Sequence, residues 1–316
     1  MSQNYLDFES PIAELEEKIL DLQSSEENDK DKLALEISKL NESVIKTTEK
    51  IYSNISAWQN VQIARHPQRP HFIDYVERIC EDFDELHGDR HYGDDRAIIG
   101  GLASIGDHRV VLIGHEKGRT TEEKIKHNFG MAQPEGYRKA RRLMEFSERF
   151  SLPVVTLVDT PGAYPGIDSE ERGQSEAIAN NLLVMSSLNT QILVNVIGEG
   201  GSGGALALAV GDHITMMQYS TYSVASPEAC ASIVWRDSTK AAEAAEAMQL
   251  NSESILRLKL IDEILPEPLG GAHRNLDQIS TTLKNSIIQN LNNLKALPLK
   301  ELVDRRYKRL MSYGSL

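Results

Sequence analysis

The stretch ILVNVIGEGGSGGALALAVGD, residues 192–212, decides the fold of this chain. It begins with mostly β-branched, apolar residues, which are typical of a buried strand. Glycines follow, and the Ala/Leu-rich segment after them is predicted to form a helix over 203–211. The stretch therefore indicates a strand that turns through glycines into a helix, as in α/β folds.

The glycines of this turn indicate a site for a negatively charged oxygen. The first turn of a helix leaves backbone N–H groups unpaired, and the helix dipole adds partial positive charge there. Glycines allow a ligand to approach those groups closely. Close packing between helix and strand is the plainer interpretation, although one or two glycines would serve that purpose.

Two nucleotide-binding motifs can be compared with this turn. Gly198, Gly200 and Gly203 match the dinucleotide pattern G-x-G-x-x-G, but Ser220 stands near the place where an acidic residue is required. A phosphate-binding P-loop needs Lys followed by Ser or Thr after its last glycine, and Ala-Leu stands there instead. The dinucleotide site is therefore a weak match, and the P-loop is excluded.

A serine-hydrolase site is an alternative interpretation of the same turn. Ser202 lies at the centre of Gly200–Gly204, which satisfies the nucleophile pattern G-x-S-x-G. Asp212 and His273 follow it in the order Ser, Asp, His that α/β-hydrolases use. The strand, turn and helix context also agrees, so this alternative stays open at the level of the residues.

A second arrangement of strand, glycine turn and helix is predicted at another strand end. The strand-like segment VVTLVDT, ending at Thr160, leads into PGAYPG (161–166) and then into the helical segment ERGQSEAIANNL (171–182). Two strand ends thus offer backbone donors. A tight turn shaped by Pro161 and Pro165 is the simpler alternative.

The rest of the chain alternates strand-like and helix-like segments. Predicted strands cover 98–105, 110–116, 153–160, 192–198 and 214–226. Predicted helices cover 73–86, 135–150, 170–187, 203–211 and 276–294. Before them, the apolar spacing predicts two helices, over 12–22 and 33–58, that pack as an N-terminal hairpin.

The composition describes an acidic globular protein. The net charge of −13 argues against general nucleic-acid binding, which needs clustered cations. No apolar run reaches the roughly 18 to 20 residues that span a bilayer, and the N-terminus lacks the order of a signal peptide. We therefore expect a cytoplasmic protein. Cys80 and Cys230 alone cannot build a disulfide framework or a Cys-ligated zinc site, so no metal site is expected.

One segment departs from the acidic average. Residues 117–142 contain eight Lys and Arg residues against three Glu residues, which makes a local anion site conceivable. A solvated helix face with scattered salt bridges is the equally simple alternative. The basic residues are Lys117, Arg119, Lys124, Lys126, Arg138, Lys139, Arg141 and Arg142.

Six segments together resemble one protein family. They are LVDTPGAYPG (157–166), EERGQSEAIA (170–179), IGEGGSGGALA (197–207), YSVASPEACASIVW (222–235), PEPLGGAHRN (266–275) and NFGMAQPEGYRKA (128–140). With the opening and closing segments, they make the whole chain similar to the carboxyltransferase alpha subunits of bacterial acetyl-CoA carboxylase. The region around 22–32 fits least well.

The resemblance implies a fold and a division of the chain. The fold would be the α/β crotonase-like (ClpP/crotonase) ββα superhelix with an N-terminal helical hairpin extension. The expected units are an N-terminal helical extension at 1–36, a crotonase-like carboxyltransferase domain at 37–292 and a basic tail at 293–316. The hairpin is a candidate for a subunit contact.

The resemblance also implies an activity and partners. The reaction would transfer the carboxyl group from carboxybiotin, carried on the biotin carboxyl carrier protein, to acetyl-CoA, forming malonyl-CoA in the first committed step of fatty acid synthesis. A beta subunit would complete an α2β2 assembly and carry the family's zinc, and biotin carboxylase would supply carboxybiotin. No membrane and no nucleic-acid partner is expected.

The resemblance assigns roles to particular residues. Gly203 and Gly204, with Ala205 adjacent, would form one oxyanion hole from backbone N–H groups, with the biotin ureido oxygen as the favoured ligand. The beta subunit would supply the other hole. Substrate-binding roles are expected for Gly162, Ala163, Gly166, Gly200, Gly201, Lys124, Arg138 and Arg141, the last three for CoA phosphates.

Overall fold

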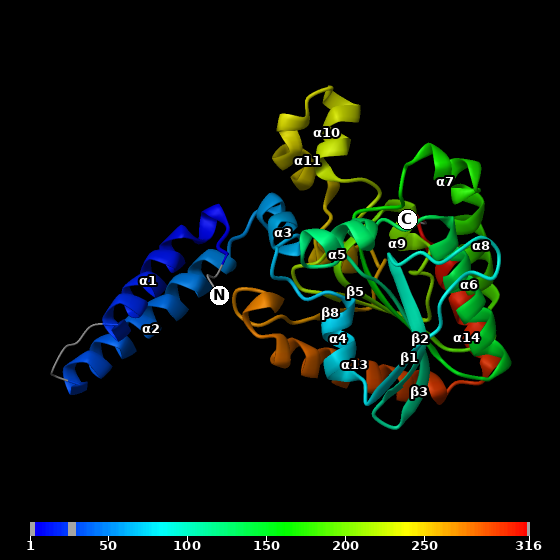
Figure 1. Cartoon of the computed structure of the whole chain (residues 1–316), viewed down its shortest axis with the longest axis horizontal. Helices are drawn as coiled ribbons and strands as arrows, with labels where there is room; N and C mark the ends of the chain where they lie inside the picture. The colour runs from blue at the N-terminus through cyan, green and yellow to red at the C-terminus, as the bar shows by residue number, and fades with distance from the viewer. Residues whose placement is uncertain (1–3, 25–29, 315–316) are drawn as a thin grey trace.

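The chain forms an α/β body from which two helical parts project (Figure 1). The computed structural model describes residues 4–24 and 30–314. The strands are β1 (Asp82–Glu85), β2 (Ile98–Ile105), β3 (His108–His115), β4 (Val154–Thr160), β5 (Ile192–Gly201), β6 (His213–Met217), β7 (Thr221–Ser223) and β8 (Glu263–Leu265). The α-helices are α1 (Ser10–Ser24), α2 (Lys30–Tyr52), α3 (Ala57–Ala64), α4 (Phe72–Ile79), α5 (Thr121–Lys126), α6 (Pro134–Arg149), α7 (Ile167–Glu171), α8 (Gln174–Ser187), α9 (Ser202–Leu206), α10 (Pro227–Trp235), α11 (Ala241–Met248), α12 (Ser252–Arg257), α13 (Leu276–Lys295) and α14 (Leu299–Ser312).

A single mixed sheet organises the body. Its order is β1-β2-β3-β4-β5-β6-β8, and β7 pairs with the far end of β5. The strands β1, β2 and β3 pair antiparallel, whereas β3, β4, β5, β6 and β8 run parallel. The carboxyl ends of β3, β4 and β5 therefore meet at one edge, where ligand sites of parallel sheets lie.

Helices cover both faces of the sheet and bury two apolar clusters. Alternate residues of a strand point to opposite faces, so Val194 and Val196 pack with α6 and α8, whereas Leu193 and Ile197 pack with α4 and α13. The strand β5 is buried along its whole length because both faces are covered. Both faces of the sheet are therefore buried by helices.

Four predicted elements of the body are wrong in extent. The helix predicted over 170–187 is broken at Arg172 and Gly173, between the end of α7 and the start of α8. The helix predicted over 73–86 ends at Ile79, and β1 follows it, because residues 82–85 pair with β2. The helix predicted over 203–211 is only the short α9, and the strand before it continues through the glycines to Gly201. The strand predicted over 214–226 is two strands, β6 and β7, with a turn between them.

The predicted N-terminal hairpin is present as α1 and α2, and Figure 1 shows it projecting from the body. Its second helix ends at Tyr52 instead of continuing to residue 58. At its base the fully buried Glu9 accepts hydrogen bonds from the Tyr52 hydroxyl (2.8 Å) and from the Arg274 guanidinium (3.2 Å). These contacts join the hairpin to the segment before α13.

The division into units at 1–36, 37–292 and 293–316 stays a prediction. Helix α2 runs without a break across residues 36 and 37. The expected basic tail is mostly the helix α14, which returns to the body. There the buried Arg306 forms two hydrogen bonds with the Asp212 carboxylate, at 2.8 and 2.7 Å.

Candidate active site at the carboxyl edge of the sheet

Two glycine turns meet at the carboxyl ends of β4 and β5. A methyl group added at Gly204 would lie 2.6 Å from the amide nitrogen of Ala163 and from the carbonyl carbon of Gly162. One added at Gly201 would lie 2.2 Å from the carbonyl oxygen of Pro161. Glycine is therefore required at both positions because backbone packs directly on backbone.

The first turn of α9 presents backbone N–H groups beside this contact. Ser202, Gly203 and Gly204 open the helix, so their N–H groups have no acceptor within it. Gly203 differs from Gly204, since a methyl group there would lie 3.7 Å from the Ile178 side chain and would meet no other described residue. Ser202 is exposed and has a φ of 51°, a left-handed conformation that costs free energy in a non-glycine residue. Strain of this kind collects at functional sites.

The structure brings together some of the residues predicted to form the site. Gly162, Ala163, Gly201 and Gly204 lie in one contact region, and Gly203 precedes Gly204 in the first turn of α9. The side chain of the neighbouring Ala205, by contrast, is buried in the core between α9 and the sheet.

Gly166 and Gly200 have packing neighbours of their own. A methyl group at Gly166 would lie 2.3 Å from the ring of Tyr164, and one at Gly200 would lie 2.7 Å from the ring of Tyr222. Their substrate-binding role stays a prediction.

The alternatives for the glycine turn do not fit the geometry. Asp212 stands just before β6, at the opposite end of β5 from Ser202, and is held by Arg306. His273 stacks on His66 with ring centroids 3.8 Å apart, and its ring nitrogens form no hydrogen bond with any residue that the structure describes. The three residues therefore do not form a Ser-His-Asp triad.

The dinucleotide motif fails for a related reason. Gly198 and Gly200 lie inside β5 and not in a turn. A methyl group at Gly198 would lie 2.3 Å from the Asp159 carboxylate, so this glycine makes room for a neighbouring side chain.

A buried charge network that sequence reasoning missed lies at the same edge, on the face covered by α4 and α13. Lys117 contacts the carboxylates of Asp159 (2.6 Å) and Glu199 (3.0 Å). Arg65 contacts Glu199 (2.6 Å) and, in α10, Glu228 (2.6 Å). Lys117 and Glu199 are 82 residues apart in sequence, so no local pattern indicates their contact.

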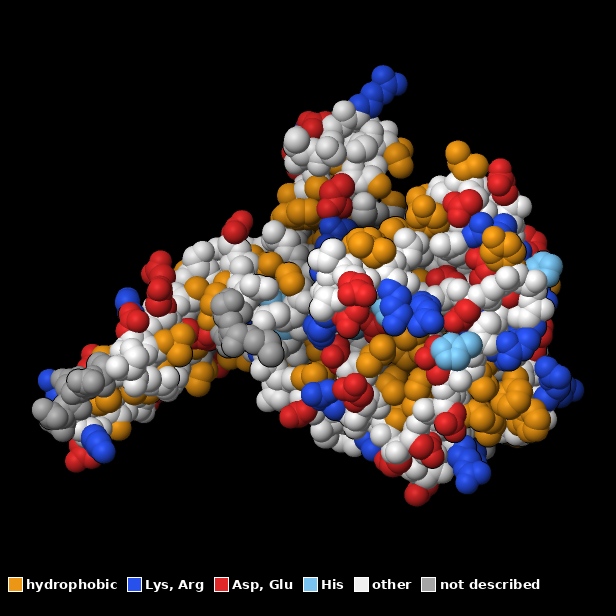
Figure 2. All heavy atoms as spheres, viewed as in Figure 1, with side chains coloured by type: hydrophobic (Ala, Val, Ile, Leu, Met, Phe, Trp, Pro, Cys, Tyr) orange, Lys and Arg blue, Asp and Glu red, His pale blue; other side chains and the backbone are white. Residues whose placement is uncertain are grey.

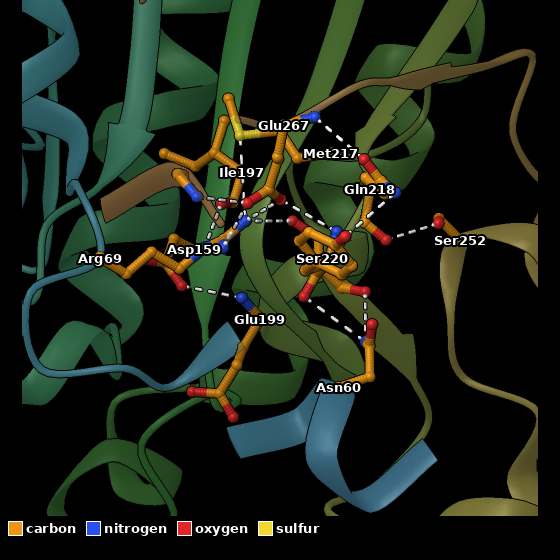
Figure 3. A network of polar contacts seen from close by, with 12 residues as sticks. Asn60, Arg69, Asp159, Ile197, Glu199, Met217, Gln218, Ser220, Ser252 and Glu267 are labelled. Atoms are coloured by element: carbon orange, nitrogen blue, oxygen red, sulfur yellow. Dashed lines mark hydrogen bonds and ion pairs between the residues drawn. The ribbon is translucent and has the colours of Figure 1, made fainter. Parts of the chain in front are cut away.

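A second buried pair adjoins this network, and Figure 3 shows its contacts. The Arg69 guanidinium contacts both carboxylate oxygens of Glu267, at 2.7 and 3.0 Å, and donates to the Ile197 carbonyl. The Glu267 carboxylate also accepts from the backbone N–H groups of Tyr219 and Ala272. Figure 3 also shows Asp159 accepting the backbone N–H of Glu199, at 2.9 Å.

A cavity of about 270 Å³ opens beside these charges. Arg65, Lys117, Lys124, Phe129 and Pro161 are among its lining residues. The paired cations in it are already neutralised by carboxylates, whereas Lys124 forms no ion pair within the described residues. The cavity therefore combines apolar surface with one available ammonium group.

The other two predicted phosphate ligands lie elsewhere, on α6. Arg138 donates to the Arg172 carbonyl and lies near Glu135, and Arg141 pairs with Glu145 at 3.2 Å. Figure 2 shows basic and acidic side chains interspersed over the face it displays, not one basic patch. Binding of CoA phosphates by Lys124, Arg138 and Arg141 stays a prediction.

The charge network makes stability depend on pH through Glu199. Burial by itself would raise the pKa of Glu199, but Lys117 and Arg65 outweigh it and lower the pKa from 4.5 to about 2. A carboxyl group with a lowered pKa in the folded state contributes stability above its unfolded pKa and loses it as the pH falls towards the folded pKa. We expect the difference in unfolding free energy between wild type and Glu199→Gln to be constant from about pH 7 to about pH 5 and to shrink below about pH 4.5.

Urea unfolding of both proteins at several pH values measures this difference. Glu170→Gln, at an exposed position, provides the matched control. An undiminished difference at about pH 3.5 would contradict the role of Glu199.

Neither a membrane helix nor a metal cluster is found in the part of the chain that the structure describes. None of its helices combines the length and the apolar character that crossing a membrane requires. Residues 4–24 and 30–314 also contain no group of three or more His, Cys, Asp or Glu residues that could hold a metal ion.

Comparison with known structures identifies the fold. Transcarboxylase 12S, in a crystal structure with methylmalonyl-coenzyme A bound, matches with a TM-score of 0.55 and 18% identity over 70% of this chain, which spans 43% of that chain. A Pseudomonas malonate decarboxylase hetero-tetramer matches with a TM-score of 0.59 and 14% identity, covering 76% of this chain and 94% of that chain. These likenesses confirm the crotonase-like α/β fold.

Sequence comparison extends over the full length. The "Acetyl-coenzyme A carboxylase carboxyl transferase subunit alpha" of Saccharophagus degradans is 58% identical over 315 residues, covering 100% of this chain and 99% of that protein. The protein of the same name from Methylococcus capsulatus is 59% identical over 314 residues, covering 99% and 98%. The family described as acetyl co-enzyme A carboxylase carboxyltransferase-like matches residues 5–314. The chain therefore belongs to this carboxyltransferase family.

Proposed function

We propose that this chain is the alpha subunit of an acetyl-CoA carboxyltransferase that moves the carboxyl group of carboxybiotin to acetyl-CoA and forms malonyl-CoA. The observation that carries the proposal is the contact of the Gly162–Ala163 backbone with Gly204, beside the first-turn N–H groups of α9, which have no acceptor within that helix. Its partners are a zinc-bearing beta subunit in an α2β2 assembly, the biotin carboxyl carrier protein and biotin carboxylase.

The role of the chain is to stabilise negative charge on oxygen. As the carboxyl group leaves biotin, the ureido oxygen gains charge, and the N–H groups of Gly203 and Gly204 donate to it. Losing one such donor commonly costs about 10² to 10³ in rate. The α-proton of acetyl-CoA passes to the biotin nitrogen that has lost the carboxyl group, and the α-carbon forms the new bond to the carboxyl carbon. No side chain of this chain is needed as base, and the second oxyanion hole belongs to the beta subunit.

Co-expression with the beta subunit of the same source tests this function. The purified complex is expected to decarboxylate malonyl-CoA in the presence of biocytin, the reverse of the forward reaction. Each subunit alone is expected to be inactive, because each supplies one of two holes. A correctly assembled complex without this activity would contradict the proposal.

Two experiments on Ser202 distinguish the proposed carboxyl transfer from serine hydrolysis. The α–β complex with Ser202→Ala is expected to keep most of its activity, since the backbone N–H groups remain. A fluorophosphonate probe is expected to leave Ser202 unlabelled, because His273, the histidine of the hydrolase pattern, stacks on His66 instead of activating it. Mass spectrometry of the treated chain checks this, and a covalent adduct on Ser202 would revive the hydrolase interpretation.

A further inference from the structure

We infer that Thr160 is a positioning residue, whose buried hydroxyl sets the place of the Gly162 turn against α9 and so the aim of the oxyanion donors. This inference rests on the proposed function. Thr160 ends β4 and is fully buried. Its hydroxyl oxygen lies 2.7 Å from the Gly130 carbonyl, 2.9 Å from the Gly162 carbonyl and 3.1 Å from the Gly162 amide nitrogen.

The hydroxyl joins two turns at once. It carries one hydrogen, which it donates to the nearer carbonyl, that of Gly130, while its lone pairs accept the N–H of Gly162. Gly162 has a φ of +150°, which side-chain-bearing residues rarely adopt. A flexible glycine is thereby fixed through its own amide by a rigid β-branched residue.

The turn on the other side of the hydroxyl is strained. Asn128, Phe129 and Gly130 have φ values of 46°, 56° and 77°, three left-handed residues in succession. Two of them are not glycine, so this conformation persists only where neighbouring contacts impose it. The hydrogen bond of Thr160 to the Gly130 carbonyl is one such contact.

An irregularity of the sheet brings the hydroxyl to this place. Along β4 and β5, Val158 pairs with Val196, but Thr160 pairs with Gly200, so β5 has extra residues between the two pairs. Such bulges redirect side chains beside active sites. Here the bulge lies beside Thr160, whose hydroxyl is within hydrogen-bonding distance of both the Gly130 turn and the Gly162 turn.

The Gly162 turn packs directly against α9, so the two must move together. The space beside Gly204 is filled by the backbone of Gly162 and Ala163, so a shift of that turn displaces the first turn of α9. A misplacement of about 1 Å at reacting groups can cost about 10² in rate. The far end of the same turn is held independently, because the Gln174 amide donates to the carbonyls of Ala132 and Tyr164, both at 2.9 Å.

The test compares Thr160→Val and Thr160→Ser in the α–β complex. Thr160→Val keeps the shape and removes the hydroxyl, and it is expected to lower kcat by about 10- to 100-fold with KM changed by less than about threefold. Thr160→Ser restores the hydroxyl and is expected to recover most of the kcat. The matched control is Thr190→Val, which removes another buried hydroxyl, bonded to the Leu152 carbonyl at 2.7 Å, at the far end of β5. It is expected to leave kcat unchanged.

Several results would overturn the inference. They are a Thr160→Val complex with wild-type kcat, an equal loss in Thr190→Val, and a Thr160→Ser complex as slow as Thr160→Val. If Thr160→Val does not assemble, Thr160→Cys, which keeps the volume and weakens the hydrogen bond, replaces it with the same expected split between kcat and KM.

A second readout does not depend on the proposed function. In the full chain without its partner, Thr160→Val is expected to speed amide hydrogen exchange over 160–166 and 202–206, whereas Thr190→Val leaves both segments unchanged. Unaltered exchange in Thr160→Val would refute the positioning role by itself. Faster exchange, together with an inactive wild-type complex, would instead contradict the proposed function and leave the positioning role standing.

Discussion

Gly204→Ala is expected to lower the kcat of the α–β complex by about 10² to 10³. The added methyl group would lie 2.6 Å from backbone atoms of Gly162 and Ala163, and backbone cannot move aside as a flexible side chain can. The first turn of α9 must therefore swing away, and its N–H groups lose their aim at the oxyanion. Decarboxylation of malonyl-CoA with biocytin measures kcat, and size-exclusion chromatography checks assembly.

Two other glycines calibrate this loss. Gly203→Ala places its methyl group at an ordinary distance of 3.7 Å from Ile178, so its effect is expected to be smaller, under about tenfold. Gly93→Ala adds a methyl group that meets no described residue within 4 Å, and it serves as the control outside the site. A loss in Gly204→Ala no larger than that in Gly203→Ala would show that the backbone contact does not aim the donors.

Arg69→Met is expected to lower the free energy of unfolding by about 3 to 5 kcal/mol. The Arg69 side chain is 2% exposed and that of Glu267 is fully buried, so the substitution leaves a carboxylate without its counter-charge away from water. The Ile197 carbonyl also loses its donor. Urea unfolding of the chain measures the change.

Two further variants distinguish the effect of an unpaired buried charge from the effect of lost packing. Adding Glu267→Gln to Arg69→Met removes the unpaired charge and is expected to restore part of the lost stability. Arg78→Met breaks the exposed pair with Asp277, at 3.1 Å, and is expected to cost less than about 1 kcal/mol. Similar losses in Arg69→Met and Arg78→Met would contradict the importance of burial.

The sequence predicts the elements of this fold where local chemistry decides them. The β-branched runs at 98–105, 153–160 and 192–198 are strands because their residues fit a sheet buried on both faces. The helix predicted over 73–86 fails after Ile79 because the next residues pair with β2. That pairing is a tertiary contact, which overrides helical spacing.

The residues of the candidate site are also predicted from the sequence only in part. The glycines near 162 and 204 can be identified from the sequence, because glycine is the residue type that allows close approach of another backbone. The roles of Thr160 and Glu199 cannot, since their partners come from distant segments and many threonines and glutamates would look the same. A polar residue at the end of a predicted buried strand is the one signal that points towards them.

A small rotation at the base of the N-terminal hairpin would produce a much larger displacement at the far end of α2. Helix α2 has 23 residues and is therefore about 35 Å long. Its base is held by the Glu9 contacts with Tyr52 and Arg274. A rotation of about 5° at that base moves the far end of α2 by about 3 Å, given this length. The position of the far end of α2 thus depends on the contacts at the base, which are the hydrogen bonds of Glu9 and the packing of Ile12 and Tyr52 on Ile63 and Tyr219.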